Sequence, residues 1–410
     1  MSKYLFVVGG LVMGGVETYI VRLAIQLSKM GHNVTVLLLS RSYDADLMQE
    51  LIKAASVEFH SPINYFHANS WLNGLIPFNV KRKSSYDIIH VVDLLTLSFI
   101  FLNKKYLTTK YLTIGIYHSA EIFWWRNDAP YFRKKMLLLF DKNAHNAIYP
   151  NEVTASMAAS VSSTLNEKFD VVPIGIDLTR YASIKSGSPE RMRKIVSVGR
   201  LVEFKTYNWS VISELSSLRE LGDYQYFIYG TGPNESLLRT HAMTCGVDKY
   251  VHFIGHVNYE KLPTVLQNAF CFVGSGTTII EAAAAGVPSL VGIETVSNGK
   301  CGGFFCDIIG FSYNEIAAFK ELVKYEDMFL YLHKMNSTEY SDLSEAHRAK
   351  ASSFDIKNTA TAFHVKSLYK FPEFDISFNR WVALMSLVAS VLIRGNTAFK
   401  RRFDNPVIPP

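Results

Sequence analysis

Arg200, Lys205 and Glu281 are the side chains whose types and positions best suit chemistry on a ligand. Arg200 and Lys205 follow the apolar run Lys194–Val198, and Glu281 lies at the expected amino end of a helix in a later strand–turn–helix unit. In such a unit the carboxyl end of the strand and the amino end of the helix meet at a ligand crevice. Two cations suit a diphosphate, and a carboxylate accepts two hydrogen bonds from a pair of sugar hydroxyls. The pattern therefore predicts a nucleotide-sugar site.

These segments resemble the retaining glycosyltransferases of the large group 1 family, which have the GT-B fold. The matching motifs are, in chain order, Gly199-Arg200 with Lys205, Gly230-Thr231-Gly232-Pro233, Phe253-Ile254-Gly255, and Glu281-Ala282 through Gly286-Val287-Pro288. Each motif alone is weak, but their common order makes the match specific. The first half is more loosely similar, through Gly14-Gly15-Val16-Glu17 and Val172-Pro173-Ile174-Gly175-Ile176-Asp177.

Both halves of the chain alternate strand and helix patterns. Short, continuously apolar runs separated by helical stretches indicate parallel sheets that are covered on both faces. The expected strands are 4–8, 33–39, 56–60, 87–92, 111–117 and 147–149 in the first half, and 194–198, 224–229, 250–254, 269–273 and 289–292 in the second. The helix after Gly15 carries one apolar stripe and stops at Gly31.

We therefore expect an α/β protein of two doubly wound, Rossmann-like domains that face a central cleft, as in the GT-B fold. A polar, turn-rich stretch, 183–190, precedes the first strand of the second half and marks the boundary. We assign residues 1–180 to an acceptor-side domain and 181–360 to a nucleotide-sugar domain. The resemblance implies that residues 361–410 form a helical tail that crosses back to the first domain.

Composition restricts the class of protein. The chain has 410 residues, of which 49% are hydrophobic and 19% charged, with a net charge of +6. These values exclude a mainly disordered chain and allow two domains of ordinary size. Lys3 and the apolar run after it imitate a signal peptide, but the run is broken by glycine pairs and leads into a helix with Glu17 and Arg22, so we expect a first strand. No apolar run is long enough for a membrane-spanning helix.

The resemblance implies roles for residues of both halves. His118, Arg200 and Lys205 are the expected catalytic residues. The expected donor-binding residues are Gly14, Gly15, Arg200, Lys205, Gly230, Gly232, Ile254, Gly276, Thr277, Thr278 and Glu281. The cations would stabilise the leaving nucleoside diphosphate in place of a metal, so we expect no metal site and no cofactor.

Each of these residues also has an ordinary structural interpretation. Arg200 and Lys205 could be surface charges, and Glu281 a favourable acid near a helix end. Gly14 and Gly15 could serve only a tight strand-to-helix turn. His118 could be a satisfied core histidine. His90 and Asp93, at the end of another expected strand, could line the acceptor side, although helix capping is an equal possibility for Asp93.

The chain departs from the family pattern at two positions. The family has a further Glu upstream of the one at Glu281, in a longer loop, and here that position is Val273 and the loop is short. The carboxylate that usually holds the hydroxyls of the donor sugar is therefore missing, and Thr277, Thr278 or loop N–H groups are the expected substitutes. Lys205 is followed by Thr206 where the family usually has Gly.

Basic clusters beside aromatic residues suggest peripheral contact with a membrane. Arg133-Lys134-Lys135 follows Trp124-Trp125, and the tail combines the apolar segment Phe378–Ile393 with several cations. Such mixtures suit a lipid interface, and they also suit a solvated helix face above a buried one. We expect a cytoplasmic protein that can work at the inner face of the cytoplasmic membrane, and no binding of nucleic acid because no recognition module is present.

The function that we expect is transfer of a sugar from a nucleoside-diphosphate sugar to a hydroxyl of a glycan or lipid-linked glycan, in cell-surface polysaccharide biosynthesis. The resemblance implies retention of anomeric configuration. Two alternatives stay open: a nucleotide-sugar epimerase of the same fold, and a non-catalytic nucleotide-sugar-binding scaffold, for which Val273 is the best support.

Overall fold

The computed structural model describes residues 1–60, 83–118, 138, 140–160, 171–185, 193–294, 296 and 298–368. The chain divides into two compact units. The first comprises Met1–Gly175 together with Lys357–Pro410, and the second comprises Ile176–Ile356. These divisions lie within a few residues of the expected boundaries at 180 and 360. None of the helices in the described ranges combines the length and the apolar character needed to cross a bilayer.

The first unit is built on one parallel sheet with the strand order β3-β2-β1-β4-β5-β6. This is the order of a doubly wound dinucleotide-binding sheet, in which the strand order reverses between β1 and β4. The described elements are β1 Lys3–Val8, α1 Gly15–Lys29, β2 Asn33–Leu38, α2 Ala45–Ile52, β3 Ser56–Phe59, β4 Ser84–Val91, α4 Leu94–Asn103, β5 Leu107–Gly115, η1 Ala144–Asn146, β6 Ala147–Ile148, α7 Glu152–Ala159 and α14 Ile356–Lys366.

The second unit repeats the scheme with the order β11-β10-β7-β8-β9, also parallel throughout. The strand order here reverses between β7 and β10. The main elements are β7 Arg193–Val198, α8 Tyr207–Leu221, β8 Tyr224–Tyr229, α9 Glu235–Thr244, β9 Val251–Gly255, α10 Leu262–Leu266, β10 Cys271–Gly274, α11 Thr277–Ala284, β11 Ser289–Val291, α12 Tyr325–Lys334 and α13 Ser337–Ser352. The short elements are η2 Leu178–Arg180, η3 Asp248–Tyr250, η4 Tyr259–Lys261, β12 Lys300–Cys301, η5 Phe305–Asp307, η6 Ile316–Ala318 and β13 Val323–Lys324.

The expected α/β class and the expected strands are confirmed. The largest difference lies in β4 and β5, which begin earlier than expected, at Ser84 and Leu107. These polar, partly exposed ends pair with each other, Ser84 opposite Leu107 and Tyr86 opposite Thr109. Backbone pairing extends the two strands beyond their apolar runs, so hydrophobicity alone could not show where they start.

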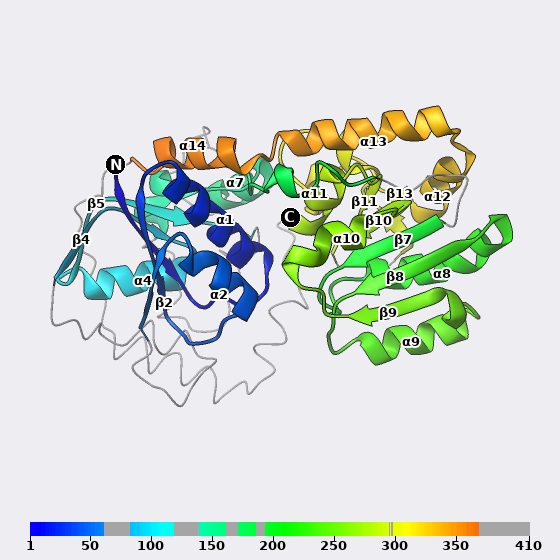
Figure 1. Cartoon of the computed structure of the whole chain (residues 1–410), viewed down its shortest axis with the longest axis horizontal. Coiled ribbons are helices and arrows are strands. Elements are labelled where there is room, and N and C mark those ends of the chain that lie inside the picture. Colours follow the sequence, from blue (N-terminus) through cyan, green and yellow to red (C-terminus); the bar gives the residue numbers. More distant parts are fainter. Residues whose placement is uncertain are drawn as a thin grey trace. The chain divides into compact units, whose positions relative to one another are not determined.

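The last described helix, α14, belongs to the first unit although it follows the second in sequence (Figure 1). Its Phe363 is fully buried and lies 5.7 Å from the ring of Phe6 and 4.9 Å from that of His90, between ring centroids. His364 on the same helix hydrogen-bonds to the hydroxyl of Tyr4. The return of the chain to the first unit therefore completes the core over β1 and β4.

We predict that Phe363→Ala destabilises the first unit by about 3–5 kcal/mol, because it removes a buried aromatic ring and leaves a cavity. Urea unfolding should show the loss. Val365→Ala on the same helix is the matched control, since Val365 is 66% exposed and its truncation should cost little. Equal effects of the two substitutions would mean that α14 is not part of the core.

Candidate functional site

The carboxyl ends of all five strands of the second unit lie at one edge of its sheet, because the strands are parallel. In open α/β sheets a ligand binds at this edge, where the strand order reverses. Here the reversal lies between β7 and β10. The loop after β7 contains Arg200 and Lys205, and the loop after β10 leads into α11 through Gly276. The topology therefore brings the expected cations and the start of α11 to the same point.

Arg200 and Lys205 come from one short turn. The Lys205 N–H donates to the Val202 carbonyl at 3.1 Å, and the Lys205 side chain folds back over Gly199, with its Nζ 2.9 Å from where a Cβ at position 199 would lie. Arg200 is exposed. Among the residues that the structure describes, neither cation forms an ion pair with a carboxylate. Both charges are therefore available to an anionic ligand.

The loops after β7 and β8 touch through their backbones. The Gly199 N–H donates to the Tyr229 carbonyl at 2.9 Å, and the Leu201 N–H donates to the Thr231 carbonyl at 3.0 Å. A Cβ on Gly230 would overlap the Gly199 carbonyl oxygen, and one on Gly232 would overlap that of Leu201. These glycines are therefore required for the close approach that fixes the turn carrying Arg200.

The amino ends of α8 and α11 both lie at this edge, and neither N-cap residue makes a side-chain capping hydrogen bond. Gly276, the N-cap of α11, has a φ of +76°, which favours glycine, and Thr277 and Thr278 form the first turn. The Thr278 hydroxyl donates to the Val198 carbonyl at 3.3 Å and so ties α11 to the end of β7. The N–H groups of uncapped helix ends are suited to bind an anion.

A buried polar network lies beneath these loops. Ser197 Oγ is 2.6 Å from both the Val273 carbonyl oxygen and the Tyr226 hydroxyl, and that hydroxyl donates to Asn208 Oδ1 at 2.6 Å. The four residues come from β7, β10, β8 and α8. Val273, where the family has a carboxylate, is a fully buried strand residue. The network fixes the three central strands of the sheet, β10, β7 and β8, and the start of α8 to one another.

Ile254 lies at the same edge, next to the last residue of β9, and is 52% exposed. Gly255 follows Ile254 in the sequence, and its carbonyl accepts a hydrogen bond from the Gly230 N–H at 2.7 Å. This bond joins the end of β9 to the loops after β7 and β8. An apolar surface is thereby held beside the glycine turn.

The first unit places its own glycine loop at its reversal point, between β1 and β4. Gly14 is the N-cap of α1 and Gly15 its first residue, and Gly14 has no side chain that could cap the helix. The Thr18 hydroxyl donates back to the Gly14 carbonyl at 2.9 Å. Gly14 and Gly15 therefore begin a helix whose first N–H groups point to the carboxyl edge of the first sheet.

The two histidines expected near this edge differ in environment. His118 is exposed and follows β5, which ends at Gly115 rather than at the histidine. His90 is fully buried and bonds through Nδ1 to the Thr113 hydroxyl and through Nε2 to that of Tyr117, both at 2.9 Å. Burial lowers the pKa of His90 to about 3, so its ring is neutral. His90 is therefore a core residue, and the idea that it lines an acceptor site is wrong.

Asp93 caps α4. Its Oδ1 accepts from the Thr96 N–H at 2.7 Å, and the Thr96 hydroxyl accepts from the Asp93 N–H, which together form a capping box. Of the two interpretations of Asp93, capping is confirmed.

Two family sequence patterns match consecutive parts of the chain. Glycosyltransferase Family 4 matches residues 13–180, and Glycosyl transferases group 1 matches residues 181–298. The chain belongs to the group 1 glycosyltransferases. The second match contains every site residue described at the edge of the second sheet, and the first contains Gly14, Gly15 and His118.

Two curated relatives of this glycosyltransferase are similar over part of their length. A GDP-mannose-dependent alpha-(1-6)-phosphatidylinositol monomannoside mannosyltransferase of Mycobacterium tuberculosis is 29% identical over 159 residues, which are 32% of this chain and 41% of the relative. The putative colanic acid biosynthesis glycosyltransferase WcaL of Escherichia coli is 30% identical over 138 residues, 32% of this chain and 34% of the relative. The chain thus matches less than half the length of these relatives.

A solved structure supports the GT-B fold. HepE of Anabaena, in complex with UDP and glucose, superposes with a TM-score of 0.61 over 89% of this chain and 99% of its own. Sequence identity to it is 13%, so the likeness concerns the fold alone.

Glu281 does not open a helix as expected. The helix begins at Thr277, and Glu281 lies in the second turn, where it is 1% exposed. The left-handed Gly276 starts α11 earlier than the apolar pattern suggested. Glu281 lies on the same helix face as Thr277, which is one turn closer to the edge of the sheet. Glu281 is therefore not merely a favourable acid at the end of a helix.

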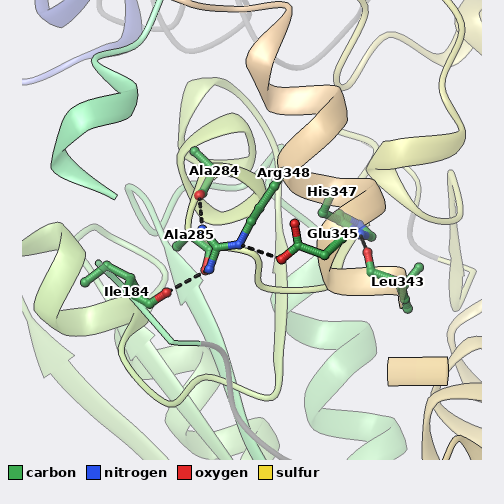
Figure 2. Close-up of polar contacts among 7 residues, drawn as sticks. All are labelled: Ile184, Ala284, Ala285, Leu343, Glu345, His347 and Arg348. Atoms are coloured by element: carbon green, nitrogen blue, oxygen red, sulfur yellow. Dashed lines mark hydrogen bonds and ion pairs between the residues drawn. The ribbon is translucent and has the colours of Figure 1, made fainter. Parts of the chain in front are cut away.

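The far end of α11 is held by Arg348 of α13 (Figure 2). The guanidinium donates to the carbonyls of Ala284 at 2.9 Å, Ala285 at 2.8 Å and Ile184 at 2.7 Å, and its Nε is 3.4 Å from a Glu345 carboxylate oxygen. Carbonyls at the carboxyl end of a helix lack intrahelical donors, and a cation there also complements the helix dipole. Arg348 therefore fixes the helix that carries Thr277, Thr278 and Glu281.

Three features were not expected from the sequence: the structural use of Thr206 and Glu294 at this edge, and Arg348 at the far end of α11. The Thr206 hydroxyl donates to the Val296 carbonyl at 2.6 Å, which Gly could not do. Glu294 follows β11 and accepts a hydrogen bond from Ser275 at 3.2 Å. Glu294 could have been found from the sequence, because it is an acid shortly after a strand of a parallel sheet. No sequence pattern points to Arg348, which lies far along the chain in α13.

The expected membrane-contact residues, Trp124, Trp125, Arg133–Lys135 and the segment Phe378–Ile393, lie outside the described residues. Within the described ranges, no group of three or more His, Cys, Asp or Glu side chains could hold a metal ion.

We predict that Gly232→Ala weakens binding of a nucleoside diphosphate at least ~10-fold, because the new Cβ would displace the Leu201 backbone and with it Arg200. Overpacking of this kind also costs about 1–3 kcal/mol of stability. Calorimetric titration measures the affinity.

Gly246→Ala is the matched control for this experiment. Gly246 has a φ of +68°, no atom lies within 4 Å of the place that a Cβ would take, and the residue lies at the other end of α9. The variant should lose stability, about 1–2 kcal/mol for the left-handed conformation, and keep its affinity. Similar affinity losses in both variants would mean that the glycine contact does not position the site.

Proposed function

We propose that the protein transfers a sugar from a nucleoside-diphosphate sugar to a hydroxyl of a glycan or lipid-linked glycan, with retention of configuration. The observation that carries the proposal is the meeting of Arg200, Lys205 and two uncapped helix ends at the reversal point of the second sheet. This arrangement suits a diphosphate that gains negative charge as the glycosyl bond breaks.

Each residue at the edge has a role in this proposal. Arg200 and Lys205 neutralise the leaving diphosphate and make a divalent metal unnecessary. The first turn of α11, with Gly276, Thr277 and Thr278, donates hydrogen bonds to the phosphates. Glu281 accepts from the ribose hydroxyls, and the exposed Ile254 offers apolar surface to the base. Gly230 and Gly232 act by shaping the loop that holds Arg200.

The first unit supplies the remaining parts. The helix end at Gly14 and Gly15 binds the donor phosphate or the acceptor, and His118 contacts the reacting sugar. His118 follows a strand of the same sheet and is exposed, as such a contact requires.

The relatives support a lipid-linked or polysaccharide acceptor. By its name, the mycobacterial enzyme uses GDP-mannose and a phosphatidylinositol mannoside, and the Escherichia coli relative acts in colanic acid biosynthesis. An acceptor with a lipid anchor would require work at the cytoplasmic face of a membrane, which we include in the proposal together with a role in cell-surface polysaccharide biosynthesis.

Val273 favours one alternative, a nucleotide-sugar-binding scaffold without catalysis, because the family's carboxylate is absent from β10. Incubation with UDP-, GDP- and ADP-sugars, with and without lipid-linked acceptors, distinguishes the functions. Acceptor-dependent release of nucleotide supports the transferase. An isomerised donor would show an epimerase, and binding without either product would show a scaffold.

We predict that Arg200→Ala and Lys205→Ala each lower kcat/KM by ~10²-fold or more, because each removes a cation from the developing charge. Chelators should have little effect on the rate. Lys249→Ala is the control, since this exposed lysine in η3 precedes β9 at the opposite edge of the sheet. Strict dependence on Mg²⁺ or Mn²⁺, or an unaltered rate in both site variants, would contradict the mechanism.

A second prediction concerns Glu281. Glu281→Gln should weaken binding of the free nucleoside diphosphate by ~1.5–3 kcal/mol, through loss of charge-assisted hydrogen bonds to the ribose. Calorimetry against the 2′-deoxy nucleotide supplies the control, because the variant should lose its difference between the two ligands. If wild type binds both equally, Glu281 does not contact the ribose.

A further inference from the structure

One carboxylate at the reversal point has no role in the mechanism above. Glu294 lies just after β11, and its Oε1 accepts a hydrogen bond of 3.2 Å from the hydroxyl of Ser275 in the loop after β10. Ser275 is 1% exposed, whereas Glu294 is half-buried. The serine therefore holds the carboxylate at the start of α11.

The segment that carries Glu294 is fixed on its other side as well. The Val296 carbonyl accepts from the hydroxyl of Thr206, next to Lys205, at 2.6 Å. Glu294 is thus tied to the loop after β10, and Val296 to the start of α8. These two hydrogen bonds place Glu294 among the groups that the proposed function assigns to the donor.

The charge of Glu294 also acts on a buried phenol. Tyr313 is buried, and burial, followed by the charges of Glu315 and Glu294, raises the pKa of its phenol. The Glu294 carboxylate is thus hydrogen-bonded to Ser275 and acts on Tyr313 through its charge, and the cations of the site lie on the loop after β7.

A carboxylate is a poor partner for a phosphate, since like charges repel. It is a good partner for neutral hydroxyls, because its two oxygens offer about four acceptor positions and Ser275 occupies one of them. The part of a nucleotide sugar that carries neighbouring neutral hydroxyls beyond the diphosphate is the transferred sugar.

We propose that Glu294 binds hydroxyls of the donor sugar and so replaces, from the loop after β11, the carboxylate that is absent at Val273. This inference rests on the proposed function. It also names a substrate class: the donor carries a neutral, hydroxyl-bearing sugar, and a uronic acid is rejected because its carboxylate would meet that of Glu294.

The test is calorimetric titration of wild type, Glu294→Gln and the control Glu220→Gln, an exposed carboxylate at the far end of α8. The ligands are UDP, UDP-glucose and UDP-glucuronate, and GDP, GDP-mannose and GDP-mannuronate. For Glu294→Gln we expect unchanged affinity for the free diphosphate and a loss of about 10- to 100-fold for the neutral donor. Wild type should prefer the neutral donor over the uronate, and the variant should prefer it less.

Ser275→Ala is a second variant. It keeps the Glu294 carboxylate and removes the hydroxyl whose hydrogen bond orients it. Ser275→Ala should lose less affinity for the neutral sugar donor than Glu294→Gln does, and it should lose no affinity for the free diphosphate. Equal losses for diphosphate and donor in Glu294→Gln, unchanged donor affinity, or a wild-type preference for uronates would each overturn the role of Glu294. If one of these results is found and wild type still binds the diphosphate and transfers sugar, the role of Glu294 is wrong and the proposed function is retained. If wild type binds no nucleoside diphosphate, both proposals fall.

Discussion

The candidate site depends on backbone contact between the loops after β7 and β8. Hydrogen bonds from Gly199 and Leu201 join these loops, and the approach is so close that neither Gly230 nor Gly232 has room for a Cβ. A backbone held in this way does not depend on side-chain rotamers. The backbone of the turn with Arg200 and Lys205 is therefore held in place without a ligand, and the ordering cost of binding falls mainly on the two side chains.

Contacts beneath that turn also hold the site in position. The parallel order of the strands brings the loops that follow them to one edge. The hydrogen bonds among Ser197, Tyr226, Asn208 and the Val273 carbonyl fix the three central strands and α8. Arg348 then holds the distal end of α11 through three backbone carbonyls. Groups that touch a ligand are thus few, and more residues serve to hold them in position.

Much of this could be predicted from sequence, and the exceptions have physical causes. Continuous apolar runs gave the strands, because both faces of a parallel sheet are buried. The polar starts of β4 and β5 were missed because backbone pairing sets them. Glu281 was placed at a helix start because the left-handed conformation of Gly276 cannot be seen in an apolar pattern. His90 looked functional at a strand end, and only the positions of Thr113 and Tyr117 show that it is a satisfied core residue.

The two cations of the candidate site and the carboxylates of Glu281 and Glu294 lie on different segments of the second unit. The cations lie on the loop after β7, the carboxylates of Glu281 and Glu294 lie on α11 and after β11, and the uncharged Ser275, Thr277 and Thr278 lie near the carboxylates at the start of α11. Among the described residues no ion pair joins the two sets. A site of cations alone would bind any polyphosphate, and a site whose cations were paired with its carboxylates would bind none well. Separation lets one ligand satisfy both sets only if it carries a diphosphate and neutral hydroxyls in the same molecule, which is the chemistry of a nucleotide sugar.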